Sequence, residues 1–320
     1  MPAIEAIAGS LGGAYPLLSI VNPLISEVEM IDSNEKTTKL SGVRTVLIYR
    51  HGLVTRLTHW LNAVCLGILV LSGLQIFNAY PTLQWGNIGA DTDPFLARIE
   101  SSNVGDQPRG TLRIGNHAIP TTGLFGASKQ NGEWTSRAFP AWMTLPSGQD
   151  LAAGRRWHFF FAWVFVINGL LYGLVSLLRG HFKRDLLPSS RELRPRYIWH
   201  EVLEHVHLRF PKGEAARRYN AIQKLSYLSV IVILLPLMVL TGLSMSPAID
   251  AAAPILPDLF GGRQSARTIH FITAALLVVF VLVHVLMVLL SGFWNNMRSI
   301  ITGAYAIKVK EQTDDNLVSS

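Results

Sequence analysis

Cysteine is almost absent from this 320-residue sequence, and charged residues make up only 15% of it. The single cysteine, Cys65, excludes a disulfide framework, a CxxCH site for covalent haem and a thiolate set for an iron–sulfur cluster. Hydrophobic residues reach 49%, a share that predicts an integral membrane protein with sizeable loops. We therefore interpret the net charge of +7 as basic loops held on one side of a membrane.

The first 56 residues contain no Lys or Arg before Lys36 and so lack the basic start of a signal peptide. We interpret residues 1–56 as a cytoplasmic extension and residues 306–320 as a cytoplasmic tail. Four apolar runs between them are long enough to cross a bilayer. They cover residues 57–77, 157–178, 225–245 and 268–293. The sequence thus predicts an all-α fold, an integral membrane four-helix bundle over residues 57–305, with large loops at 78–156 and 179–224.

The distribution of basic residues predicts the orientation of these helices. Nine Lys or Arg residues lie between His181 and Asn220, whereas the loop 246–266 contains only Arg263. Loops rich in Lys and Arg stay on the cytoplasmic side. We therefore expect a multi-pass membrane protein with both termini and loop 179–224 cytoplasmic and loop 78–156 on the outer side.

Two histidines in the fourth run, His270 and His284, lie fourteen residues apart. This spacing is about 21 Å along a helix and falls about 40° short of four whole turns, so both imidazoles share one face. With the predicted orientation, His284 lies at the cytoplasmic depth of His59, and His270 at the outer depth of His158. Two bis-imidazole pairs without a covalent cysteine are expected for two b-type haems. Zinc is the weaker alternative, because two histidines leave two tetrahedral positions empty.

Three arginines, Arg56, Arg155 and Arg267, each lie three residues before one of these histidines. Residues at i and i+3 share a helix face, so each arginine could bind a haem propionate. Ordinary placement of long basic side chains at helix ends explains them equally well. Gly73 lies fourteen residues after His59 and is expected to leave room for the edge of the other haem.

The remaining histidines carry weaker signals. His200-Glu201-Val202-Leu203-Glu204-His205 differs by one residue from the HExxH zinc motif. With His207 it could form a metal site, although a solvated helical segment explains it better. We assign no ligand role to His51 or His117.

The stretches RLTHWLNAVCLGILVLSG and YNAIQKLSYL, together with His158 and the His270/His284 spacing, resemble the bacterial cytochrome b561 and nickel–iron hydrogenase b-type cytochrome superfamily. The resemblance covers residues 49–305 and implies a protein of the bacterial inner membrane, with loop 78–156 in the periplasm. It implies iron ligands on the first, second and fourth helices, which match His59, His158, His270 and His284. It is closest to the cytochrome b subunits of periplasmic molybdopterin oxidoreductases, such as thiosulfate reductase-like and formate dehydrogenase gamma-like chains.

We therefore expect an electron-transfer subunit that connects a periplasmic oxidoreductase to the membrane quinone pool and has no catalytic residue of its own. The partner would dock on loop 78–156, which contains Trp85, Trp134 and Trp142. Electron flow toward quinone is the direction that we expect. A self-contained quinone-linked oxidoreductase, acting on superoxide or a small molecule, is the alternative, and a transporter or scaffold fits the paired histidines less well.

Overall fold

The structure is a computed structural model that describes residues 43–89, 94–105, 107–178, 180, 187–207 and 221–310. The predictions for residues 1–42 and 311–320, and for much of the basic loop 179–224, fall outside this part of the chain. The chain divides into two compact units. Residues up to Val46 and from Ala306 onward form one unit, whose described part belongs to a two-stranded sheet of β1 (Val43–Tyr49) and β8 (Ala304–Lys310). Residues Leu47–Tyr305 form the other unit.

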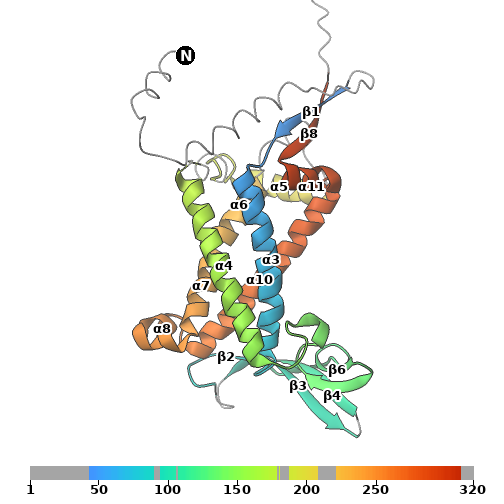
Figure 1. Ribbon diagram of the computed structural model, residues 1–320, viewed down its shortest axis with the longest axis vertical. Coiled ribbons are helices and arrows are strands. Elements are labelled where there is room, and N and C mark those ends of the chain that lie inside the picture. Colours follow the sequence, from blue (N-terminus) through green and yellow to red (C-terminus); the bar gives the residue numbers. More distant parts are fainter. Residues whose placement is uncertain are drawn as a thin grey trace, which may run out of the picture. The chain divides into compact units, whose positions relative to one another are not determined.

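Four helices of the larger unit are long and apolar enough to cross a membrane (Figure 1). They are α3 (Leu53–Phe77), α4 (Leu151–Leu178), the segment Ala221–Ser244, and α10 (Arg263–Leu290). Each of these helices contains most of one predicted apolar run, and each begins several residues before that run.

The third span consists of α6 (Ala221–Ser229), the π-helical turn η4 (Val230–Leu234) and α7 (Leu235–Ser244). Pro236 explains this interruption. A proline lacks the backbone N–H and its ring collides with the carbonyl four residues earlier, here that of Val232. The wider π-helical turn accommodates the missing hydrogen bond without ending the helix.

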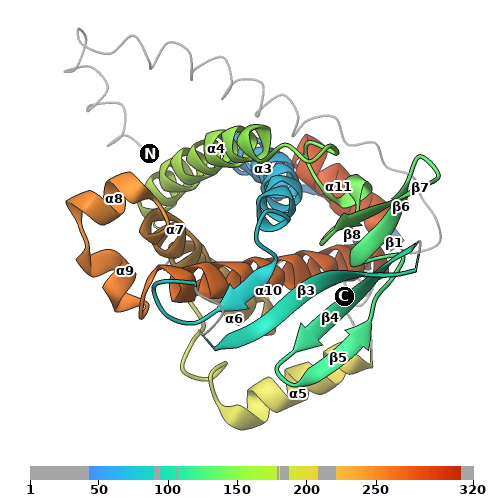
Figure 2. The same ribbon diagram turned by 90° about the horizontal axis from the view of Figure 1, so that it is seen from below.

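The spans pack as two helix pairs (Figure 2). In one pair α3 lies along α4, and in the other α7 lies along α10. Between the described parts of the two pairs, the Cα atoms approach each other at isolated points at most. The backbones of the two helix pairs therefore stay apart.

The segment between α3 and α4 is folded into β-strands, so the expectation of an all-α fold applies to the spans alone. A four-stranded antiparallel sheet has the order β2–β3–β4–β5, and β6 and β7 form a separate hairpin. The strands and the 3₁₀ turn that follows them are β2 (Thr82–Gln84), β3 (Phe95–Val104), β4 (Gln107–Ile114), β5 (His117–Pro120), β6 (Gly126–Gln130), β7 (Glu133–Arg137) and η1 (Ala141–Met143).

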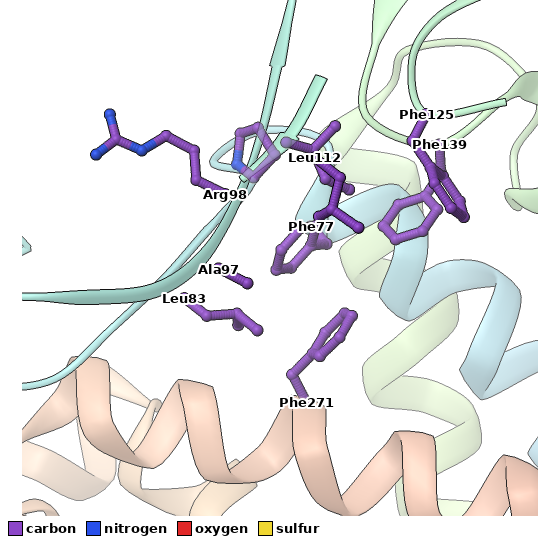
Figure 3. A pocket seen from close by; sticks show the side chains of 10 residues that line it. Phe77, Leu83, Ala97, Arg98, Leu112, Phe125, Phe139 and Phe271 are labelled. Atoms are coloured by element: carbon purple, nitrogen blue, oxygen red, sulfur yellow. The ribbon is translucent and has the colours of Figure 1, made fainter. Parts of the chain in front are cut away.

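An aromatic cluster joins this β-region to the ends of α3 and α10. The ring centroid of Phe77 lies 4.7 Å from that of Phe271 and 5.7 Å from that of Phe139. Together with Phe125 these rings line a cavity of about 220 Å³ (Figure 3). The cluster anchors the β-region beside the helix turn that carries His270.

Hydrogen bonds fix β2 directly on the first turns of α10. The Arg267 guanidinium donates to the Thr82 carbonyl at 2.9 Å, and the Thr268 hydroxyl donates to the Gln84 carbonyl at 2.6 Å. One turn earlier, the Ser265 hydroxyl accepts from the backbone N–H of Gly86 at 2.8 Å. The β-region is therefore attached to the membrane helices at fixed positions.

Four further helices in the described part of the chain lie outside the spans. They are α5 (Pro195–Val206), α8 (Pro247–Ala252), α9 (Ile255–Leu259) and α11 (Phe293–Thr302). In Figure 1, α5 and α11 lie at the end of the bundle opposite to the β-region.

Candidate haem-binding site

The four histidines of the spans meet in the two pairs that the sequence predicts. The ring centroids of His59 on α3 and His284 on α10 are 6.4 Å apart, and those of His158 on α4 and His270 on α10 are also 6.4 Å apart. We name them the inner pair and the outer pair, respectively. Each pair joins one half of the bundle to the other across the space between the helix pairs. His270 of the outer pair directly precedes Phe271, which belongs to the aromatic cluster, and the outer pair therefore lies beside the β-region.

Both centroid distances fit a metal ion bound between two imidazoles. A metal–nitrogen bond is about 2 Å long, and the centre of a five-membered ring lies about 1 Å from its nitrogen. Two such arms span about 6 Å, close to the observed separations. Among the described residues, no group of three or more His, Cys, Asp or Glu side chains could hold a metal ion. A porphyrin, which supplies four nitrogens itself, suits such two-histidine sites better than tetrahedral zinc.

The outer histidines are each held by a hydroxyl from the neighbouring helix. The Ser72 hydroxyl oxygen on α3 lies 3.1 Å from Nδ1 of His158, and the Thr241 hydroxyl oxygen on α7 lies 3.0 Å from Nδ1 of His270. Ser72 and Thr241 are both fully buried. Within each helix pair, one helix supplies the histidine and the other supplies its hydrogen-bond partner.

The inner pair has a different environment. Among the described residues, the buried Nδ1 of His59 has no hydrogen-bond partner. The ring of His284 stacks on Phe280, with centroids 6.2 Å apart and planes 19° apart, while Trp60 meets His59 edge-on at 5.5 Å. Each histidine of the inner pair thus contacts an aromatic ring, whereas each histidine of the outer pair is held by a hydroxyl group.

Gly73 lies against the outer pair, at the depth that its spacing from His59 indicates. A Cβ atom added there would lie 3.3 Å from Cε1 of His158. Gly242 repeats this arrangement on α7, where an added Cβ would lie 3.4 Å from Cε1 of His270. The two glycines let the helices approach the imidazoles closely. Whether either of them also contacts a porphyrin edge stays a prediction.

The sequence analysis missed Ser72, Thr241 and Gly242, although a signal for them exists. Val70–Leu74 reads VLSGL and Val239–Leu243 reads VLTGL. This short repeat marks the two helices that support the outer pair. It is visible only when the third span, which has no histidine, is compared with the first.

The three arginines have partners of different kinds. Arg267 donates to the backbone carbonyls of Thr82 and Tyr80, and its guanidinium lies over the Phe77 ring. Arg56 donates to the carbonyl of Ile301 at 2.7 Å, while its buried Nε has no partner among the residues that the structure describes.

Arg155 lies over the ring of Phe159, with Cζ 5.7 Å from the centroid. Each of the three guanidinium groups thus already contacts a backbone carbonyl or an aromatic ring. Binding of a propionate by these arginines stays a prediction.

Two titratable groups near the helix ends are strongly influenced by burial. Burial and the neighbouring Arg50 guanidinium lower the pKa of His51 to about 4. Arg137 is only 5% exposed and donates to the Ser147 carbonyl and to the side chains of Gln75 and Thr144. Burial lowers the pKa of this guanidinium as well.

Comparisons with known proteins agree with this geometry. A curated relative from Azospira oryzae, named putative protein-methionine-sulfoxide reductase subunit YedZ1, is 28% identical over 235 residues, which cover 73% of this chain and 87% of the relative. Its name indicates a different reductase from those that the sequence resemblance suggested. The family model of prokaryotic cytochrome b561 matches residues 50–303, a stretch that contains all four paired histidines. The chain therefore belongs to the prokaryotic cytochrome b561 family, whose members are haem-binding membrane proteins of electron transport.

Proposed function

We propose that this protein is a di-haem electron-transfer subunit that connects a periplasmic oxidoreductase with the membrane quinone pool. The observation that carries the proposal is the presence of two histidine pairs, each 6.4 Å between centroids, at two depths along α10. The fourteen residues between His270 and His284 correspond to about 21 Å along the helix. Two redox centres at these positions would carry electrons across most of an apolar core of about 30 Å.

The four histidines would hold the two haems, which would supply one-electron chemistry at iron. His59 and His284 would be the ligands of the inner site, and His158 and His270 those of the outer site. The remaining task of the chain is to position these ligands and to exclude water from the space between the helix pairs. The apolar side chains of the spans support the second role, because an apolar environment offers ionised species no solvation.

The β-region supports a docking role for the segment between α3 and α4. It is a folded platform fixed to α10 by hydrogen bonds from Arg267 and Thr268, beside the outer pair. It presents Trp142, which is 73% exposed, and Trp85, which is 39% exposed. Trp134 is less accessible, and Lys129 lies over its ring. A platform of this kind favours a separate periplasmic partner over a self-contained enzyme.

The curated relative suggests what the partner does. Its name describes a subunit of a protein-methionine-sulfoxide reductase. Reduction of a sulfoxide to a thioether and water consumes two electrons and two protons. Oxidation of a quinol to a quinone releases the same number of each. We therefore propose that electrons flow from quinol through the inner and outer sites to a sulfoxide-reducing partner, a direction opposite to the one we expect from the sequence alone.

The histidine assignment is tested by haem content. Purified protein should contain two non-covalent b-type haems with distinguishable low-spin spectra. His59→Ala or His284→Ala should remove the inner haem, and His158→Ala or His270→Ala the outer haem, because each substitution takes one of two axial ligands. One haem per chain, or loss of the same haem in all four variants, would contradict the proposal.

The docking role is tested with exposed tryptophans. Trp142→Ala should slow electron exchange with the copurified periplasmic partner while leaving haem reduction by a quinol unchanged. Trp294→Ala is the matched control, because Trp294 is 83% exposed on α11 at the other end of the bundle. Equal effects of the two substitutions on partner exchange, or no effect of Trp142→Ala, would refute the docking surface.

A further inference from the structure

The outer pair is supported by two equivalent dipeptides on two different helices. Ser72-Gly73 on α3 contacts His158, and Thr241-Gly242 on α7 contacts His270. In each case the hydroxyl lies about 3 Å from Nδ1 and the glycine leaves room beside Cε1. The same chemistry thus occurs twice around one site, on segments that share the pattern VL(S/T)GL.

The hydrogen-bond geometry determines which ring nitrogen carries the proton. A hydroxyl has one proton to donate and two lone pairs to accept with. Ser72 donates to the Ile68 carbonyl at 2.6 Å, and Thr241 donates to the Leu237 carbonyl at 2.6 Å. Both hydroxyls must therefore accept from the Nδ1–H groups of their histidines.

A neutral imidazole carries one proton, so a proton on Nδ1 leaves Nε2 with a free lone pair. The Nε2 atoms of His158 and His270 would then be the atoms that bind iron.

The inner pair lacks an equivalent support at one of its ligands. Within the described part of the chain, the buried Nδ1 of His59 has no hydrogen-bond partner. A hydrogen bond from the far nitrogen makes an imidazole a more basic ligand, and a more basic ligand stabilises ferric over ferrous iron. The two sites therefore differ in a feature that tunes reduction potential.

We propose that Ser72 and Thr241 are positioning residues that fix the tautomer of the outer ligands and lower the reduction potential of the outer haem. This inference rests on the haem ligation proposed above. Loss of an outer-shell partner typically changes metal affinity or activity by about 10–100-fold. Both substitutions leave the histidine ligands themselves in place, so we expect the lower end of that range. A tenfold change in the ferric-to-ferrous preference corresponds to about 59 mV for a one-electron couple.

The test is a potentiometric titration of both haems in the full-length protein. The double variant Ser72→Ala/Thr241→Val should raise the midpoint potential of the outer haem by about 59 mV and leave that of the inner haem unchanged. Each single variant should give part of the shift. Unchanged potentials in a double variant that still binds two haems would overturn the inference.

Two further variants separate this role from packing. Thr273→Val removes a buried hydroxyl that donates to the Ile269 carbonyl of its own helix at 2.8 Å, so both potentials should stay at their wild-type values. The exchange Ser72→Thr/Thr241→Ser keeps both hydroxyls and should keep both haems and potentials. An equal shift in Thr273→Val, or loss of the outer haem from the exchange variant as well as from the double variant, would show that the hydroxyls are not responsible.

A result that refutes the proposed function differs from one that refutes only the role of the two hydroxyls. If the wild-type protein binds no haem at the outer histidines, the ligation itself is wrong, and the hydroxyl variants have no potential to change. If the wild type binds two haems and the hydroxyl variants titrate like it, only the positioning role is refuted.

Discussion

Gly73→Ala is a single-atom test of how closely the outer pair is packed. The added Cβ would lie 3.3 Å from Cε1 and 3.6 Å from Nδ1 of His158, whereas carbon atoms in contact prefer about 3.5–4.0 Å. His158 would have to move by a few tenths of an ångström, and its bond to Ser72 would lengthen. Overpacking of this kind costs about 1–3 kcal/mol, while alanine gains about 1 kcal/mol over glycine in a helix.

The matched control for Gly73→Ala is Gly67→Ala on the same helix. An added Cβ at Gly67 meets no atom within 4 Å, so this variant gains helix propensity without a collision. We expect Gly67→Ala to be as stable as wild type or more stable, and Gly73→Ala to be less stable than Gly67→Ala by about 1–3 kcal/mol.

Thermal unfolding in detergent measures the stability difference, and the haem spectrum reports the site. Gly73→Ala should reduce the occupancy of the outer haem, or shift its absorption band, while the inner haem keeps its wild-type signal. Gly242→Ala, with an added Cβ 3.4 Å from Cε1 of His270, should do the same. If both variants match Gly67→Ala in stability and spectrum, close packing at Gly73 and Gly242 is not needed for haem binding at the outer pair.

Three further predictions concern topology, pH and helix packing. Reporter fusions after Ser320 or within residues 191–218 should be cytoplasmic and fusions within 123–132 periplasmic. The opposite result would place the His59/His284 pair on the periplasmic side and the His158/His270 pair on the cytoplasmic side. Because the pKa of His51 falls from 6.5 to about 4 on folding, the unfolded chain takes up a proton at this residue at a higher pH than the folded chain. The free energy of unfolding should therefore decrease as the pH falls from 6.5 toward 4, and His51→Gln should show a smaller decrease. Asn168 of α4 donates hydrogen bonds to Thr58 and Asn62 of α3, next to His59. Asn168→Leu should therefore weaken binding of the inner haem more than that of the outer haem, with a stability cost of about 0.6–1.7 kcal/mol; selective loss of the outer haem would contradict this.

The helix register of the histidines could be predicted because it follows from chain geometry alone. The fourteen-residue spacing of His270 and His284 places both on one face of any straight helix, and the depths of His59 and His158 follow from the alternation of spans. The observed pairs confirm this reasoning. The predicted helix starts were less accurate, because the first turns of α4 and α10 contain polar residues that a hydropathy criterion excludes.

The β-region could have been predicted in part. Asn131-Gly132 is the strongest short-range signal for a hairpin, and both residues have positive φ, at 52° and 87°, in the turn between β6 and β7. The four-stranded sheet is harder to predict, because β2 and β3 are separated by a long connection. The contact of β2 with α10 depends on residues far apart in sequence, which no local pattern encodes.

The supports of the ligands were missed because they lie on helices other than those that carry the histidines. The Ser72–His158 contact joins residues 86 positions apart, and its counterpart involves the third span, which a search for histidines passes over. Serine and threonine in membrane helices also bond commonly to their own backbone. Their sequence signal is therefore weak until a second copy of the same pattern is recognised.

The packing of α3 on α4 connects the two sites. At the level of the outer pair, Ser72 of α3 bonds His158 of α4. Near the inner pair, the buried Asn168 of α4 donates to the carbonyl of Thr58 at 3.1 Å and to Asn62 at 2.7 Å. Thr58 directly precedes His59, so each polar contact between these helices adjoins a proposed ligand. Because α10 supplies the other ligand of both pairs, one helix pair and one helix together determine the separation of the two redox centres.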